Sequence, residues 1–346
     1  MDLLRRIFGI AARTDAPAGD EVVITQGDDV AVSAPPEPVV ERPSSPPSAS
    51  RPAALSVADE GDATEIGQGD GGIVATRPLP PLETVIPQPG QRIRFGQLSD
   101  PGMVRSNNQD AVFSLLLSGA STDDLPDVGV FMVADGMGGH QEGERASAIT
   151  TRMVARYVLR EVVLALLEQR LNDPDRASIA EVLRAAVHAA NDSVNKQIPE
   201  GGTTATVTVI LGDLAHIAHV GDSRAYLLSE GSLEQITRDH SLVQRLIELD
   251  QLTPEEAAEH PQRNVLYRAI GQSETLDVDA ITRRLPPGSH LLLCSDGLWN
   301  MVAEETIAEV IERYSDPQRA CAELVELANN RGGPDNISAI LVQMPG

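Results

Sequence analysis

The stretch from Val130 to Gly143 constrains the fold of this chain more than any other part of its sequence. An apolar run rich in branched side chains ends at one carboxylate, Asp135, and three glycines follow within four residues. Such a run is typical of a buried strand, and the glycines allow a tight turn. We therefore expect a strand, a turn and a helix from about Glu144. Asp135 either caps that helix or binds a cation together with the carbonyl of Gly136.

Three further aspartates stand beside predicted strands: Asp110 before 111–117, Asp296 after 290–295, and Asp335 before 337–342. Carboxylates gathered in one place repel one another strongly unless a cation lies among them. Oxygen ligands favour Mg²⁺ or Mn²⁺ over Zn²⁺. Two such ions close together can activate a water for displacement at phosphorus. The sequence therefore suggests a two-metal site at these strand ends.

Periodic apolar patterns from residue 91 onward predict a mixture of strands and helices. Helices expected over 144–170 and 178–197 should pair across one face of a sheet. Short strands between 203 and 237 are joined by tight turns, which predicts an antiparallel meander. The residues 253–256, Thr-Pro-Glu-Glu, mark a helix start, and the polar stretch 259–264 is expected to form an irregular, mobile flap. The other expected elements are strands over 93–99 and 277–285 and helices over 242–249, 303–314 and 317–329.

The first 90 residues differ in composition from the rest of the chain. They are rich in Pro, Ala and Ser, and they carry 14 acidic and 6 basic side chains, a net charge of −8. Such a segment has too few large apolar residues to offset the entropy of ordering. We expect residues 1–90 to form a disordered acidic tail, whose first residues either form a short helix or fray, with fraying favoured. Residues 91–346 are expected to form one folded domain.

The charge and the cysteines limit the classes of function. A net charge of −24 argues against binding to nucleic acid, which needs a basic face. The sequence contains no run near the roughly 18 apolar residues of a membrane span, so no transmembrane segment is expected. Cys294 and Cys321 form neither a disulfide framework nor a metal motif, as is common in a reducing cytosol. We expect a cytoplasmic protein, with a monomer favoured.

Six motifs, in chain order, stand out in the folded part: Arg105-Ser-Asn-Asn-Gln-Asp110, Ala134-Asp-Gly-Met-Gly-Gly-His140, Gly202-Thr-Thr-Ala205, His219-Val-Gly-Asp-Ser-Arg-Ala-Tyr226, Cys294-Ser-Asp-Gly-Leu298 and Gly333-Pro-Asp-Asn336. Through them the chain, over about residues 93–343, resembles the metal-dependent protein phosphatase 2C family in its bacterial form. The resemblance implies an α+β fold, a four-layer α-β-β-α sandwich of two packed antiparallel sheets flanked by helix pairs.

The resemblance also implies a metal site with two ions, Mn²⁺ or Mg²⁺. In it Asp135 would bridge both ions, and the Gly136 carbonyl would bind one of them. Asp296 and Asp335 would bind the other ion, and Asp110 would hold a metal-bound water. A hydroxide between the ions would attack the phosphorus of phosphoserine or phosphothreonine directly, with no phosphoenzyme.

Two further site residues are implied, and four positions bear on the mechanism. Arg105 would bind the substrate phosphate, and Asp222 would belong to a weaker third metal site. Gln109 stands where many members have Glu, and Asn300 where many have a third-site acid; Met137 replaces the His that animal members have, and His140 follows nearby. We expect His140 to orient the glycine turn, with water as the proton donor.

The sequence supports three functions, of which the first is favoured. It is a protein serine/threonine phosphatase acting on phosphoproteins and opposing bacterial Ser/Thr kinases. The alternative is a catalytically weak relative that binds phosphoproteins as a regulatory module, an idea motivated by Gln109 and Asn300. The third is a small-molecule phosphatase. Metal-stimulated turnover of a phosphate ester separates the first from the second, and competition by phosphopeptides tests the third.

Overall fold

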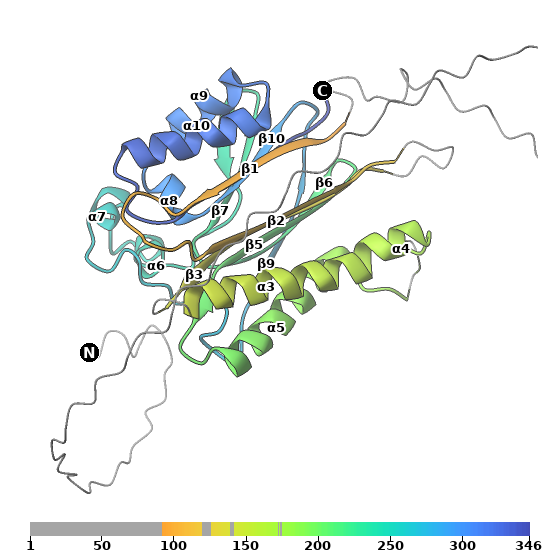
Figure 1. Ribbon diagram of the computed structural model, residues 1–346, viewed down its shortest axis with the longest axis horizontal. Coiled ribbons are helices and arrows are strands. Elements are labelled where there is room, and N and C mark those ends of the chain that lie inside the picture. Colours follow the sequence, from red (N-terminus) through yellow and green to blue (C-terminus); the bar gives the residue numbers. More distant parts are fainter. Residues whose placement is uncertain (1–91, 120–125, 139–141, 172, 174) are drawn as a thin grey trace, which may run out of the picture. The chain divides into compact units, whose positions relative to one another are not determined.

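Two antiparallel β-sheets lie face to face, and helices cover the outer side of each (Figure 1). The computed structural model describes residues 92–119, 126–138, 142–171, 173 and 175–346. These belong to the second of two units of the chain, Pro80–Gly346. The expected tail over 1–90 with its short helix lies outside the described residues, and so does His140.

The first sheet has five strands in the order β1-β11-β10-β7-β8, and every pair is antiparallel. Two helices, α9 and α10, pack their apolar faces on its outer side (Figure 1). The bounds are β1 (Arg94–Asp100), β7 (Arg224–Ser229), β8 (Ser232–Gln235), β10 (His290–Cys294), β11 (Ile337–Gln343), α9 (Glu304–Arg313) and α10 (Pro317–Asn330).

The second sheet follows the order β2-β3-β5-β6-β9, and the short strand β4 pairs with the end of β3. The helices α3 and α5 lie side by side across its outer face (Figure 1). The bounds are β2 (Asp110–Leu117), β3 (Val128–Met137), β4 (Gly202–Thr203), β5 (Ala205–Leu211), β6 (Leu214–Val220), β9 (Asp279–Arg284), α3 (Glu142–Val158), the π-helix η1 (Leu159–Val163), α4 (Leu164–Leu167) and α5 (Ile179–Gln197).

Strand β3 illustrates how the sequence pattern builds the layers. Successive side chains of a strand point to opposite faces. Phe131 and Val133 pack between the two sheets, whereas Val130 and Met132 pack against α3 and α5. Because both faces of the strand are buried, its sequence is apolar throughout, without the alternation of a strand that has one face in water.

Three short helices and their loops gather at one end of the two sheets (Figure 1). They are α6 (Leu242–Glu248), α7 (Pro254–Ala258) and α8 (Asp296–Trp299). At the start of α7, Thr253 and Glu256 form the expected capping box, in which each side chain bonds the other residue's backbone N–H. This end of the fold also holds the starts and ends of the strands that carry the predicted site residues.

The α+β sandwich expected from the sequence is confirmed, and two local details differ. The single helix predicted over 144–170 is interrupted by the π-helical turn Leu159–Val163. Val162, Val163 and Leu166 are buried and belong to the apolar cluster between the helices and the second sheet. Helix α8 was not predicted, because four residues are too few to show a period. Within the described residues, no helix is both long and apolar enough for a membrane span.

Candidate functional site

The ends of several elements meet at one cavity of about 390 Å³. Strand β3 contributes Asp135 and Gly136, helix α8 contributes Asp296, and the loop before β11 contributes Asp335. Six of the seven residues predicted for the site line this cavity: Arg105, Asp135, Gly136, Asp222, Asp296 and Asp335. The fold therefore brings together residues that lie up to 230 positions apart in the chain.

Asp135 is held by the backbone of β3 and its neighbours. Its N–H donates to the Thr204 hydroxyl at 2.9 Å, and its carbonyl accepts from the Thr204 N–H and the Thr203 hydroxyl, both at 2.8 Å. The strand continues through Met137, so Asp135 is not a helix cap. That alternative is wrong because α3 begins only at Glu142.

Gly136 stands where no larger residue fits. Its N–H donates to the Gln109 carbonyl at 3.1 Å. A Cβ built on Gly136 would lie 2.2 Å from the carbonyl oxygen of Gly143 and 2.6 Å from that of Gln109. Glycine is required here because the backbones of β3, the loop before β2 and the start of α3 converge.

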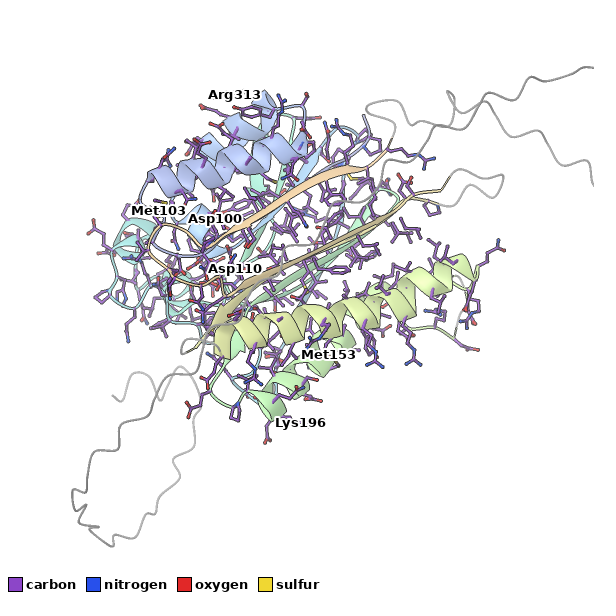
Figure 2. The ribbon with its side chains drawn as sticks, in the orientation of Figure 1. Asp100, Met103, Asp110, Met153, Lys196 and Arg313 are labelled. Carbon is purple, nitrogen blue, oxygen red and sulfur yellow. The ribbon has the colours of Figure 1, made fainter. Side chains whose placement is uncertain are left out.

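Asp110 is not among the residues that line the cavity, but it stands directly opposite Asp135 in the β2–β3 pairing. Figure 2 shows it at the same end of the fold as Met103. One carboxylate oxygen, Oδ2, accepts hydrogen bonds from the hydroxyls of Ser295 at 2.8 Å and Ser338 at 2.7 Å. The other, Oδ1, is buried with no hydrogen-bond partner, which is unusual for a carboxylate and leaves one oxygen for another ligand.

Asp296 is the first residue of α8 and follows the N-cap residue Ser295. The Asn300 side-chain amide, one turn later, donates to its Oδ2 at 3.4 Å. Asn300 therefore lies beside Asp296, as expected for a third-site position, but it presents a hydrogen-bond donor instead of a carboxylate. The carboxyl of Asp222, also predicted for a third site, belongs to a residue only 8% exposed.

Arg105 and Asp335 form an ion pair. The guanidinium Nη2 lies 2.7 Å from Oδ2 of Asp335, and the two side chains are 47% and 35% exposed. Oδ1 of Asp335 accepts from the Asn336 N–H at 2.9 Å. The predicted phosphate-binding group thus contacts a predicted metal ligand directly.

Two residues that shape the site were missed as site residues. Asn336 accepts a hydrogen bond from the Gln109 N–H at 2.8 Å and donates to the carbonyls of Pro101 and Asn107 at 3.0 and 2.9 Å. It thereby fixes the loop before β2 against β11. Ser295, which holds Asp110, is the other. Each is the sequence neighbour of a predicted site aspartate, and this position is the sequence feature from which a role at the site could have been predicted.

The surroundings of the carboxyl groups at the cavity disfavour their ionised forms. Burial raises the pKa of Asp110 to about 6 and that of Asp296 to about 7, and the carboxylate of Asp335 adds to both shifts. Burial, with the neighbouring Asp110 and Asp296, raises the pKa of Asp135 well above its ordinary value. Burial and Asp296 do the same for Asp222. A cation in this cluster would favour the ionised carboxylates.

The donors of the cavity suit a hard divalent cation. The candidate ligands are carboxylate and carbonyl oxygens, and the buried Oδ1 of Asp110 has no hydrogen-bond partner. Such ligands select Mg²⁺, Mn²⁺ or Ca²⁺ over Zn²⁺. Across the described ranges, no three His, Cys, Asp or Glu side chains are already arranged as a metal-binding group, and Asp335 is turned toward Arg105. The residues fit a metal, but the site needs a small rearrangement to hold one.

Comparison with known proteins assigns the chain to a family. The family model for protein phosphatase 2C matches residues 104–330. The serine/threonine protein phosphatase PstP of Mycobacterium tuberculosis is 36% identical over 258 residues, which are 73% of this chain and 45% of that protein. The chain therefore spans less than half the length of this relative. A putative 2C-type phosphatase of Streptococcus pyogenes is 33% identical over 249 residues, 70% of this chain and 94% of that protein.

A solved structure shows the same fold. It is the catalytic domain of a serine/threonine protein phosphatase PstP in complex with two manganese ions, with a TM-score of 0.58 and 33% identity over 72% of this chain and 97% of that one. The family model covers more than half of the present chain, and both sheets and both helix layers are present. The chain belongs to the protein phosphatase 2C family of serine/threonine protein phosphatases.

Proposed function

We propose that this chain is a metal-dependent phosphatase that hydrolyses phosphoserine and phosphothreonine in proteins, using Mn²⁺ or Mg²⁺. The observation that carries the proposal is the convergence of Asp110, Asp135, Asp296 and Asp335 with Arg105 at one end of the sheets. The manganese-bound relative supports the choice of cofactor. Ser/Thr kinases would supply the phosphorylated substrates.

The proposed roles are those that the family resemblance implies, and the positions of the residues support them. Asp135 would contact both ions, the Gly136 carbonyl one of them, and Asp296 and Asp335 the other. When bound, the two ions would supply an activated water and neutralise charge on the phosphate. Asp110, fixed by two serine hydroxyls, would accept a hydrogen bond with Oδ1 and so orient a water for in-line attack.

Arg105 would bind the substrate phosphate after leaving Asp335. A guanidinium donates two parallel hydrogen bonds to phosphate oxygens. Its ion pair with Asp335 is about half exposed, and exposed pairs contribute only about 0–1 kcal/mol. For Arg105 to leave Asp335 and bind a phosphate therefore costs little free energy. The carboxylate of Asp335 would then be free to bind a cation.

Protonation of the leaving hydroxyl would fall to water. The described residues that line the cavity include no His, Lys or Cys, and one of them, Met137, stands at the sequence position where animal members of the family have His. A third ion near Asp222 would be weakly held, because Asn300 brings no charge. All of these groups come from residues 91–346 of one chain, which we propose as the catalytic domain of an active monomer.

Incubation of the 346-residue chain with p-nitrophenyl phosphate and Mn²⁺ tests the proposal. We expect metal-stimulated release of p-nitrophenol, lost on chelation and in Asp135→Asn, and competition by phosphothreonine peptides at lower concentration than by small phosphate esters. Absence of metal-stimulated turnover would favour a phosphoprotein-binding module. Turnover that phosphopeptides do not inhibit would favour a small-molecule phosphatase.

A further inference from the structure

A turn beside the catalytic cavity is held by a buried side-chain amide of helix α5. The Gly271 N–H donates to Oδ1 of Asn191 at 2.9 Å, and Nδ2 of Asn191 donates to the Ser273 carbonyl at 2.9 Å. Asn191 is only 1% exposed, and Gly271 has a φ of +87°, a conformation that favours glycine. The residue between the two bonded positions, Gln272, therefore has a fixed backbone.

The same turn is joined to the strand end that carries the proposed metal ligands. Ile270 and Thr203 exchange backbone hydrogen bonds at 2.9 and 3.0 Å. The Thr203 hydroxyl donates to the Asp135 carbonyl at 2.8 Å, and Thr203 pairs with Gly136 where β4 meets β3. Consecutive hydrogen bonds thus connect the turn to Asp135 and Gly136, so the fold itself sets the position of the turn relative to the cavity.

The side chain of Gln272 lines the catalytic cavity at an exposed position. Its Nε2 donates to the sulfur of Met137 at 3.3 Å. A thioether is a weak acceptor, so this bond directs the amide without satisfying it strongly. An oxygen that carries negative charge is a much better acceptor, because hydrogen bonds to ionised groups are shorter and stronger. The amide can therefore change partners at little cost in free energy when such an oxygen enters the cavity.

Gln272 is one of three side-chain amides among the described residues that line the cavity, with Gln109 and Asn264. Gln109 is only 7% exposed, and Asn264 lies on the loop that follows α7. Gln272 contacts the end of β3 directly, through Met137. It therefore combines exposure to the cavity with a fixed place beside the proposed metal ligands.

Hydrolysis of a phosphate ester leaves negative charge on the oxygen of the departing alcohol. In an in-line displacement the attacking and leaving oxygens lie on opposite sides of phosphorus. With the attacking water beside Asp135, the leaving oxygen would face the open side of the cavity, where Gln272 is exposed. A hydrogen-bond donor that stands where charge develops stabilises the transition state more than it stabilises the bound ester.

We propose that the side-chain amide of Gln272 donates a hydrogen bond to the leaving oxygen of the substrate. This inference rests on the proposed function and adds a residue to its mechanism. The attacking water loses a proton to solvent, its oxygen forms the new bond to phosphorus, and the ester bond breaks with its electron pair on the leaving oxygen. That oxygen then takes a proton from water. The amide keeps its own proton throughout and stabilises the leaving oxygen until it is protonated.

Three substrates with different leaving groups test this role: p-nitrophenyl phosphate, phenyl phosphate and a phosphothreonine peptide. The nitro group delocalises the charge of p-nitrophenoxide, phenoxide keeps more charge on oxygen, and the threonine alkoxide keeps all of it there. In Mn²⁺, Gln272→Ala should lower kcat by about threefold or less for p-nitrophenyl phosphate and on the order of 10²-fold for the peptide. The loss for phenyl phosphate should lie between these. A role of Gln272 in folding alone would lower kcat for all substrates by one common factor.

Two further variants sharpen the test. Gln272→Glu keeps the length and shape of the side chain, but its ionised carboxylate offers only acceptor oxygens, so it should lose at least as much kcat with the peptide as Gln272→Ala. Gln251→Ala is the matched control, because Gln251 is an exposed glutamine beyond the end of α6 and is not among the residues that line the cavity. Its kcat should equal that of the unaltered protein for all three substrates.

The outcomes separate this inference from the proposed function. Losses by one common factor in Gln272→Ala, or an unchanged kcat with the peptide, would overturn the role of Gln272 and leave the proposed function standing. A graded loss in Gln251→Ala as large as in Gln272→Ala would also overturn it. If the unaltered protein hydrolyses none of the three esters in Mn²⁺, the proposed function fails, and the role of Gln272 fails with it.

Discussion

Asp135-Gly136 and Asp296-Gly297 are the same dipeptide in two different backbones. Strand β3 runs through the first pair without interruption. The second pair follows β10, but there the chain turns at once into helix α8, with Ser295 as N-cap. Nevertheless both aspartates line the same cavity.

What the two dipeptides share is close packing of the glycine. A Cβ on Gly136 would lie 2.2 Å from the Gly143 carbonyl oxygen, and a Cβ on Gly297 would lie 2.1 Å from the Asn336 carbonyl oxygen. In each case a neighbouring backbone presses against the residue after the acid and so fixes where the carboxylate lies. The dipeptide therefore marks a place where backbones pack closely. It does not determine whether the chain there forms a strand or a helix.

The largest difference between the two aspartates should be catalytic. Asp135→Asn would alter contacts with both proposed ions and Asp296→Asn with only one. We expect Mn²⁺-dependent turnover of p-nitrophenyl phosphate to fall by on the order of 10³-fold in Asp135→Asn and 10²-fold in Asp296→Asn. Asp213→Asn, on an exposed turn, should be unchanged. Equal losses in the two site variants would argue against a bridging role for Asp135.

Without a divalent cation, the titration of these carboxyl groups should make the free energy of unfolding of the protein depend on pH. The ordinary pKa of 3.8 is raised to about 6 for Asp110 and to about 7 for Asp296. Between about pH 4 and pH 6 the folded protein therefore keeps protons that the unfolded chain releases. The free energy of unfolding should fall as pH rises through this window, by up to about 1.4 kcal/mol per pH unit for each group, and the contribution of Asp296 should continue to about pH 7.

Urea denaturation in a chelating buffer measures this slope. Asp110→Asn and Asp296→Asn should each flatten it, and Mn²⁺ should oppose it because metal binding favours the ionised carboxylates. A free energy of unfolding that rises with pH in the unaltered, metal-free protein, or a slope unchanged in both variants, would contradict the assigned shifts.

The two glycines should be comparably intolerant of a side chain. Gly136→Ala and Gly297→Ala would each place a methyl group against backbone oxygen, and overpacking of this kind costs about 1–3 kcal/mol. Urea midpoints compared at equal slope provide the measurement. Gly119→Ala is the control, because nothing lies within 4 Å of a Cβ there. A site variant as stable as the control would show that the backbones can separate.

The smallest expected effect concerns the ion that Asp296 and Asp335 would share. The guanidinium of Arg105 is paired with the carboxylate of Asp335, so Arg105→Ala should strengthen Mn²⁺ binding at one of the two sites. The gain in affinity should be no more than about fivefold, because the ion pair is exposed and therefore weak. Isothermal titration calorimetry would detect the change, with Arg313→Ala on α9 as control. Weaker Mn²⁺ binding in Arg105→Ala would rule out competition between the guanidinium and the metal.

Much of the fold could be predicted because its signals are local. The apolar run of β3, the capping box at Thr253 and the spacing in α5 each depend on neighbouring residues. The π-turn at Leu159–Val163 and the short helix α8 could not be predicted. Both are one or two turns long, and packing against the rest of the fold decides them.

The site shows the same division. The sequence by itself determined which residues were candidates for the site: Asp135 and Asp296 precede glycine, Asp335 precedes asparagine, and Asp110 stands at the start of a predicted strand. Only the tertiary structure decided how they meet. Asp110 faces Asp135 through strand pairing, and Arg105 reaches Asp335 across 230 positions of the chain.

The cleft of about 900 Å³ beside the catalytic cavity could not be predicted from the sequence for a related reason. Its walls come from α6 and α7 on one side and from Trp299 and Met301 on the other, and each reads alone as an ordinary helix or helix end. Local patterns report which face of an element avoids water. Which faces then stand opposite each other, with space between them, depends on contacts between segments far apart in the chain, and these form only when the two sheets pack.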